Sequence, residues 1–338
     1  MGGAVVEAGM PSMGPSLCER ADAFLAAGRA REAYELLAGP QAAGDADALY
    51  ALANWRLSGQ IVGRDLAAAR ELFRRAAEAG HPQAAGVHAA FVGNGTGAAA
   101  NWPSALRLLR RQSSPDATAQ LELIERMRLS PSGEPPALPP EERLSDRPFV
   151  SLFRALLSPA ECDFLIAAAV PWLQPSVVID PQTGRQLHNP IRNSDGMSFA
   201  LVLESPAIHA LNRRIAAATG TDVTQGESLQ VLRYRNGQEY RPHLDAVGGE
   251  PNQRILTVLV YLNEGYEGGE TLFVRTGLRF KGAKGDALVF RNALPDGRAD
   301  AQALHAGCPV TAGEKLLGSR WIRARPFVFP PPRPLLDL

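Results

Sequence analysis

The sequence has little of several features that would place it in a specialised class of protein. It contains three cysteines, Cys18, Cys162 and Cys308, and this odd, widely spaced set fits neither a disulfide framework nor a zinc site. Its 35 basic side chains are balanced by 35 acidic ones, so it lacks the positive charge expected of a protein that binds nucleic acid or anionic membranes. No stretch approaches the roughly 18 apolar residues of a membrane span.

The N-terminal sequence MGGAVVEAGMPSMG also lacks the basic start and sustained apolar segment of an export signal. We therefore expect a cytoplasmic protein whose partners are proteins or small molecules, with no nucleic acid and no membrane. Hydrophobic residues make up 45% of the chain and charged residues 21%, as in ordinary globular proteins. A length of 338 residues favours two domains, each large enough to bury its own core.

The first third of the chain repeats itself at an offset of 36 residues. Ala-Gly at 43–44 recurs at 79–80, and LFRR at 72–75 recurs as LLRR at 108–111. Each unit is predicted to form two helices joined by a Gly-containing loop, and such a hairpin needs stacked neighbours to bury its apolar face. Through RDLAAARELFRRAAEAGHPQA, residues 16–128 resemble a tetratricopeptide repeat domain. Two roles stay open for it, a surface that binds a partner protein and a stabilising appendage.

Residues 129–148 are predicted to be a Pro-rich linker. From Pro131 to Pro148 the sequence PSGEPPALPPEERLSDRP blocks helix continuation and favours extended polyproline conformations. Two helices are expected next, around 158–169 and 205–219. Beyond Ser228 the chain consists of short β-branched or aromatic runs between turn residues: LQVLRY, RILTVLVYL, ETLFV, DALVF and SRWIRARPFVF. This pattern predicts a jelly roll with helical support.

Three residues of this second half have the types and spacing of a metal site. His243 and Asp245 are two residues apart, so their side chains would point to the same face of an extended strand. His305 follows sixty residues after Asp245, where a barrel could return it to the same cavity. Two imidazoles and one carboxylate on one face form the facial triad of non-haem iron(II) oxygenases, which leaves positions open for cosubstrate and oxygen.

Lys315 lies ten residues beyond His305, within an otherwise apolar strand. Leu317, Ser319 and Trp321 share its face at a period of two, and we expect that face to point inward. A cation inside a barrel needs an anionic partner. A dicarboxylate cosubstrate would supply one.

Four ordered blocks resemble the catalytic domain of the prolyl 4-hydroxylase family of iron(II)- and 2-oxoglutarate-dependent dioxygenases. They are YRNGQEYRPHLD, RILTVLVYLNEGYEGGETLF, GDALVF and LPDGRADAQALHAGCPVTAGEKLLGSRWIR, and the similar region spans residues 149–329. The resemblance implies an α+β fold: a double-stranded β-helix, or jelly-roll, oxygenase domain with supporting helices, preceded by the all-α repeat domain.

The resemblance also implies roles for individual residues. His243, Asp245 and His305 would bind iron(II) and are the catalytic residues. Lys315 would pair with the distal carboxylate of 2-oxoglutarate, assisted by the hydroxyl groups of Tyr234 and Thr271. Oxygen is the remaining reactant, and ascorbate is expected to support activity. The residues implied to bind substrate are Arg192, Glu227, Tyr240, Arg254 and Trp321.

Two departures from the usual family pattern concern the substrate mouth. Ala246 stands where an aromatic residue is frequent, and the stretch AVGGEPNQ before Arg254 is short. The leading hypothesis is hydroxylation of a prolyl residue in a peptide or protein, with succinate and carbon dioxide released and with the repeats recruiting the substrate protein. One alternative is hydroxylation of a free amino acid or a small natural-product precursor. The other is a repeat scaffold whose oxygenase domain is a sensor or is inactive.

Overall fold

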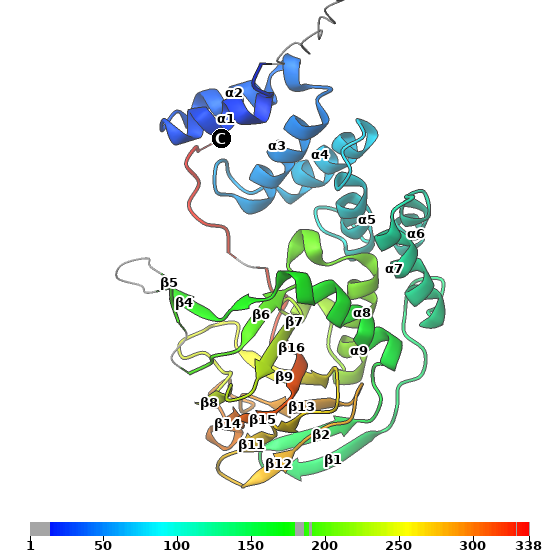
Figure 1. Ribbon diagram of the computed structural model, residues 1–338, viewed down its shortest axis with the longest axis vertical. Helices are drawn as coiled ribbons and strands as arrows, with labels where there is room; N and C mark the ends of the chain where they lie inside the picture. Colours follow the sequence, from blue (N-terminus) through cyan, green and yellow to red (C-terminus); the bar gives the residue numbers. More distant parts are fainter. Residues whose placement is uncertain (1–13, 180–185, 189–190, 329, 338) are drawn as a thin grey trace, which may run out of the picture. The chain divides into compact units, whose positions relative to one another are not determined.

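The structure, a computed structural model, describes residues 14–179, 186–188, 191–328 and 330–337 (Figure 1). It divides into two compact units. The first unit comprises Met1–His88, Thr96–Ala99 and Pro330–Leu338, and the second comprises Ala89–Gly95 and Ala100–Phe329. In the described part of the chain, no helix has the length and apolar character needed to cross a membrane.

The first unit is helical, as the sequence repeat predicts. Its helices are α1 (Leu17–Ala26), α2 (Ala30–Ala38), α3 (Ala46–Ser58), α4 (Leu66–Glu78) and the start of α5 (Ala84–Asn94). Asp45 and Asp65 cap α3 and α4, because each carboxylate accepts a hydrogen bond from a backbone N–H of the first turn. The last residues of the chain also belong here, since the N–H groups of Leu335 and Leu336 donate to the carbonyls of Gln60 and Ile61 at 2.9 Å.

The compact units differ from the domain boundaries predicted from the sequence. Helices α6 (Trp102–Arg110) and α7 (Pro115–Arg126), which the repeat pattern assigned to a domain ending at 128, belong to the second unit. Their side chains, Leu109 among them, share a buried apolar cluster with residues of the sheet domain. The predicted linker 129–148 likewise contains a strand, β1 (Glu141–Asp146). A repeat pattern shows which face of a helix is apolar, but not which element covers that face.

The second unit contains two main antiparallel sheets, which together form the predicted double-stranded β-helix. The large sheet has the order β1-β2-β13-β9-β16-β7-β6-β3, and the small one has the order β12-β11-β14-β8. The other strands of the large sheet are β2 (Phe149–Phe153), β3 (Gln174–Pro175), β6 (Asp195–Ser198), β7 (Gln230–Arg235), β9 (Arg254–Tyr261), β13 (Ala287–Arg291) and β16 (Glu314–Arg323). The small sheet comprises β8 (Tyr240–His243), β11 (Thr271–Phe273), β12 (Leu278–Phe280) and β14 (His305–Gly307). Two further pairs join β4 (Val177–Ile179) to β5 (Gln186–His188), and β10 (Glu267–Gly268) to β15 (Val310–Ala312).

Alternate residues of β9 face two different cores. Val258 and Val260 pack in the cluster that includes α8 (Pro159–Ala169) and α9 (Pro206–Thr219), the two helices beside the large sheet in Figure 1. Leu259 and Tyr261 face the other side, in a cluster with Phe273 and Phe290 of the barrel interior. The large sheet is therefore buried on both faces, and its interior face is the one available to the site.

Removing the first 140 residues should make the oxygenase unit aggregate, whereas removing only the first 88, which belong to the first unit, should leave it soluble. The chain that begins at Glu141 would lack α6 and α7. Trp102, Leu109 and Leu123 of these helices are buried against the helices of the sheet domain. Their loss would expose a contiguous apolar surface. Size-exclusion chromatography of the two shortened chains tests this. A monomeric, active chain beginning at Glu141 would show that α6 and α7 are dispensable.

Candidate active site

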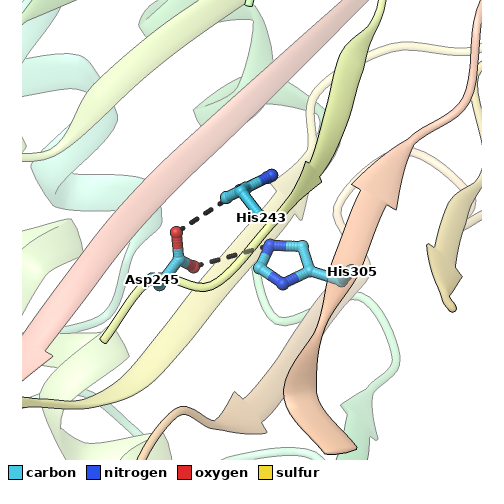
Figure 2. A group of neighbouring side chains, drawn as sticks. All are labelled: His243, Asp245 and His305. Atoms are coloured by element: carbon cyan, nitrogen blue, oxygen red, sulfur yellow. Dashed lines mark ion pairs between the residues drawn. The ribbon is translucent and has the colours of Figure 1, made fainter. Parts of the chain in front are cut away.

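His243, Asp245 and His305 converge in the barrel, although their residues come from separate elements (Figure 2). His243 ends β8 and His305 begins β14, and these antiparallel strands place the two residues directly opposite each other. Asp245 lies just beyond the end of β8. Its Oδ1 is 3.5 Å from Nε2 of His243, and its Oδ2 is 3.6 Å from Nε2 of His305. The structure thus brings together the three residues that the sequence predicted as metal ligands.

The hydrogen bonds of the two imidazole rings leave the correct nitrogen available to a metal. Nδ1 of His243 lies 2.8 Å from the carbonyl of Arg241, and Nδ1 of His305 lies 2.9 Å from the carbonyl of Ala303. A carbonyl oxygen only accepts, so each Nδ1 carries a proton, and in the neutral ring Nε2 is the nitrogen that has the free lone pair. Both free lone pairs belong to the nitrogens that face Asp245.

The electrostatics of the group also suit a divalent cation. Asp245 is 5% exposed. Burial opposes ionisation of its carboxyl, but His305, His243 and the Thr257 hydroxyl together outweigh burial and hold its pKa well below the usual range. Burial lowers the pKa of His305, which favours the neutral, metal-binding imidazole. Two imidazoles and one buried carboxylate are the donor set of a non-haem iron(II) site, so these residues fit iron(II).

Lys315 lies in β16, opposite Tyr234 of β7, and is 2% exposed. Its Nζ donates to the carbonyl of Gly269 at 2.6 Å, and within the described ranges no carboxylate lies within ion-pairing distance of it. Burial lowers the pKa of Lys315 to about 8. A buried ammonium group without a carboxylate partner is costly, so this position favours an anionic ligand.

The other residues predicted to bind the cosubstrate lie in the same pocket. Tyr234 and Thr271 line it together with Lys315 and the three metal-site residues. Burial raises the pKa of Tyr234 to about 12, so its hydroxyl stays protonated and can donate a hydrogen bond to a carboxylate. The hydroxyl of Thr271 is 2.9 Å from that of Tyr261, a contact that the sequence prediction missed. In the sequence, this contact was indicated only by the position of Tyr261, which shares the inward face of β9 with Leu259.

The predicted substrate residues divide into two groups. Arg192, Tyr240 and Trp321 line the pocket of the metal site, and Tyr240 stacks on His243 at 3.5 Å between ring centroids. Glu227, which is buried, and Arg254, which is half-buried, instead form an ion pair beside it. Glu227 accepts hydrogen bonds from Arg254 at 2.6 and 2.9 Å, and the Arg254 guanidinium lies 3.7 Å above the ring of Trp321.

Glu227 has a second guanidinium partner that the sequence prediction did not include. Nε of Arg323, at the end of β16, donates to Oε1 of Glu227 at 2.6 Å. With both arginines bound to it, Glu227 holds Arg254 in place rather than offering its carboxylate to a ligand. Arg323 could have been suspected because it shares the face of Trp321 at a period of two.

Comparisons with known proteins agree with this chemistry. The family model described as the 2OG-Fe(II) oxygenase superfamily matches residues 229–323. Prolyl 4-hydroxylase 1 of Arabidopsis thaliana is 37% identical over 203 residues, which cover 54% of this chain and 72% of that protein. Probable prolyl 4-hydroxylase 10 of the same plant is 35% identical over 210 residues, which cover 55% and 72%.

Two solved structures are similar to parts of the chain at low TM-scores. The viral collagen prolyl hydroxylase of Paramecium Bursaria Chlorella virus-1, solved as a 2OG complex, has a TM-score of 0.43 and 31% identity, covering 54% of this chain and 99% of that one. A Sel1 repeat protein from Oxalobacter formigenes has a TM-score of 0.28 and 19% identity, covering 33% and 45%. On the metal site, the matched family model and the similarity to the plant enzymes, the chain belongs to the prolyl 4-hydroxylase family and is a dioxygenase that uses iron(II), 2-oxoglutarate and oxygen.

Proposed function

We propose that this enzyme hydroxylates a prolyl residue in a peptide or protein and releases succinate and carbon dioxide. One observation carries the proposal: a single pocket is lined by the metal donors, by the buried Lys315 and by the aromatic rings of Tyr240 and Trp321. The metal donors and the cation fit a cosubstrate that carries two carboxylates. The aromatic rings offer flat apolar surfaces on which a pyrrolidine ring can pack. The two named plant relatives support the choice of proline.

Different residues of the pocket have different roles in this reaction. His243, Asp245 and His305 would hold iron(II), which when bound supplies the oxygen activation needed to hydroxylate an unactivated C–H bond. Lys315 neutralises the distal carboxylate of 2-oxoglutarate, and the hydroxyls of Tyr234 and Thr271, which line the same pocket, donate hydrogen bonds to it. These contacts orient the cosubstrate in a buried site from which bulk water is excluded.

The Glu227 ion pair positions the substrate side of the pocket. Arg254 commits Nε and Nη2 to Glu227, while its guanidinium plane lies flat over Trp321. Cation–π stacking and a two-point ion pair restrict the rotation of both side chains. A Trp321 ring that is already fixed loses less entropy when a substrate packs against it.

Incubation with peptides tests the function. The purified enzyme is supplied with iron(II), 2-oxoglutarate, ascorbate and a library of proline-containing peptides, each matched by a peptide with Ala in place of Pro. We expect mass spectrometry to find a gain of one oxygen atom on proline, with an equal amount of succinate. The matched peptides and samples with excess chelator should show no gain. Oxidation of free amino acids without any peptide product would favour the small-molecule alternative, and an absence of succinate under all conditions would favour the scaffold or sensor.

Three further points belong to the proposal. Ascorbate supports activity by keeping iron in the iron(II) state. The helical repeats recruit the substrate protein, because a stacked helical surface adds affinity far from the reacting carbon. The enzyme works in the cytoplasm, a location supported by the free thiols of Cys18, Cys162 and Cys308, which suit a reducing compartment.

A further inference from the structure

A chain of two hydrogen bonds lies behind the metal site. Thr257 is in the middle of β9, and its Oγ1 is 2.6 Å from Oδ2 of Asp245. Asn292, one residue beyond the end of β13, places its Nδ2 2.8 Å from the same Oγ1. All three side chains are buried, and Thr257 and Asn292 are each 1% exposed. The Thr257 hydroxyl helps to lower the pKa of Asp245, but nothing in the metal site or the cosubstrate pocket accounts for Asn292.

The direction of the two hydrogen bonds follows from proton counting. The Asn292 amide donates to the Thr257 oxygen, and a hydroxyl has one proton, so Thr257 donates that proton to Asp245. If Thr257 instead donated to the Asn292 carbonyl, its lone pairs would face the ionised carboxylate at 2.6 Å, which is repulsive. The charge of Asp245 therefore fixes the orientation of the Asn292 amide.

This orientation leaves a buried atom unsatisfied. Oδ1 of Asn292 has no hydrogen-bond partner among the described residues. A buried carbonyl without a donor is unfavourable, and its presence indicates that the Nδ2 bond to Thr257 is the stronger requirement. The side chain of Asn292 serves the Thr257 hydroxyl rather than the packing of the barrel.

We propose that Thr257 and Asn292 are positioning residues that hold Oδ2 of Asp245 in a hydrogen bond and leave Oδ1 as the oxygen that binds iron. A carboxylate oxygen that already accepts a short hydrogen bond is the poorer metal donor. Figure 2 shows that the two oxygens of Asp245 face different histidines, so the triad alone does not choose between them. With one oxygen withheld, the carboxylate would contribute a single donor atom to a bound metal, which would leave room there for the cosubstrate and oxygen.

The test removes the Thr257 proton donor with little change in shape. Thr257→Val takes away the hydroxyl, and Thr257→Ser keeps it. Ser151→Ala is the matched control, because Ser151 is a buried residue of β2 whose hydroxyl has no partner among the described residues. Cobalt(II) binding to the metal-free full-length enzyme is measured by calorimetry, together with the ratio of succinate to hydroxylated peptide.

We expect Thr257→Val to bind cobalt(II) about 10- to 100-fold more weakly and to form more succinate per hydroxylated peptide, as is typical when a partner of a metal ligand is lost. Thr257→Ser and Ser151→Ala should stay close to the unaltered enzyme in both measurements. Thermal denaturation checks folding. If Thr257→Val does not fold, Asn292→Leu is used instead, because it removes the hydrogen bond that Asn292 donates to the Thr257 hydroxyl.

Cobalt(II) binding within about two-fold of the unaltered enzyme, together with an unchanged succinate ratio, would overturn the assignment. The binding measurement does not depend on the substrate. If no peptide is hydroxylated but Thr257→Val still weakens cobalt(II) binding, the positioning role stands and only the prolyl substrate is wrong.

Discussion

Replacing Asp245 with alanine should reduce succinate formation to the level of the metal-free enzyme. The substitution removes the only anionic donor of the three and leaves two neutral imidazoles, which bind iron(II) poorly in competition with water. It also leaves the buried Thr257 hydroxyl without its acceptor. His243→Ala should have the same effect, because it leaves two donors instead of three.

The measurement is 2-oxoglutarate-dependent succinate formation in metal-free enzyme to which iron(II) is returned. The unaltered enzyme should regain activity with iron(II) and lose it again in excess chelator. Asp163→Ala is a suitable control, because it removes a largely exposed carboxylate of α8 whose partner is Lys284. Unchanged succinate formation in Asp245→Ala, or full activity in excess chelator, would show that the metal is bound elsewhere.

The grouping of His243, Asp245 and His305 was predictable from their residue types and spacing. The strand argument holds only for His243 and His305, because Asp245 lies beyond the end of β8 and not within it. The burial of Lys315 was also predictable, because it shares the inward face of its strand with Leu317. The fold class was predicted correctly, because the alternating runs after Ser228 and the helical repeat before them are local patterns.

The supporting residues could not be predicted, because their partners are distant in the sequence. Thr257 and Asn292 are separated by 35 positions, and Glu227 and Arg323 by 96. Each looks like an ordinary strand or loop residue until the sheet brings it to its partner. The same limit applies to α6 and α7, whose apolar faces were visible in the sequence but whose covering helices were not.

Lys315→Ala should raise the 2-oxoglutarate concentration needed for half-maximal activity by a factor of hundreds. Removing one partner of a buried charge pair typically costs about 3 to 5 kcal/mol, because the other charge is left unpaired. Cobalt(II) binding should change far less, because His243, Asp245 and His305 all remain in place. An unchanged requirement for 2-oxoglutarate would remove Lys315 from the cosubstrate site.

The pH dependence of the 2-oxoglutarate requirement separates the charge of Lys315 from its shape. Burial lowers the pKa of this ammonium group to about 8, so in the free enzyme it is charged below that pH and becomes neutral as the pH rises through it. The 2-oxoglutarate concentration needed for half-maximal activity should therefore be lowest below pH 8 and should increase above it. Above pH 8 the neutral Lys315 must take up a proton when 2-oxoglutarate binds. Lys315→Arg keeps its charge over the whole range, because guanidinium stays protonated in proteins. We expect this variant to lose the increase above pH 8 even if its affinity is lower throughout, and an increase that persists in Lys315→Arg would assign the titration to another group.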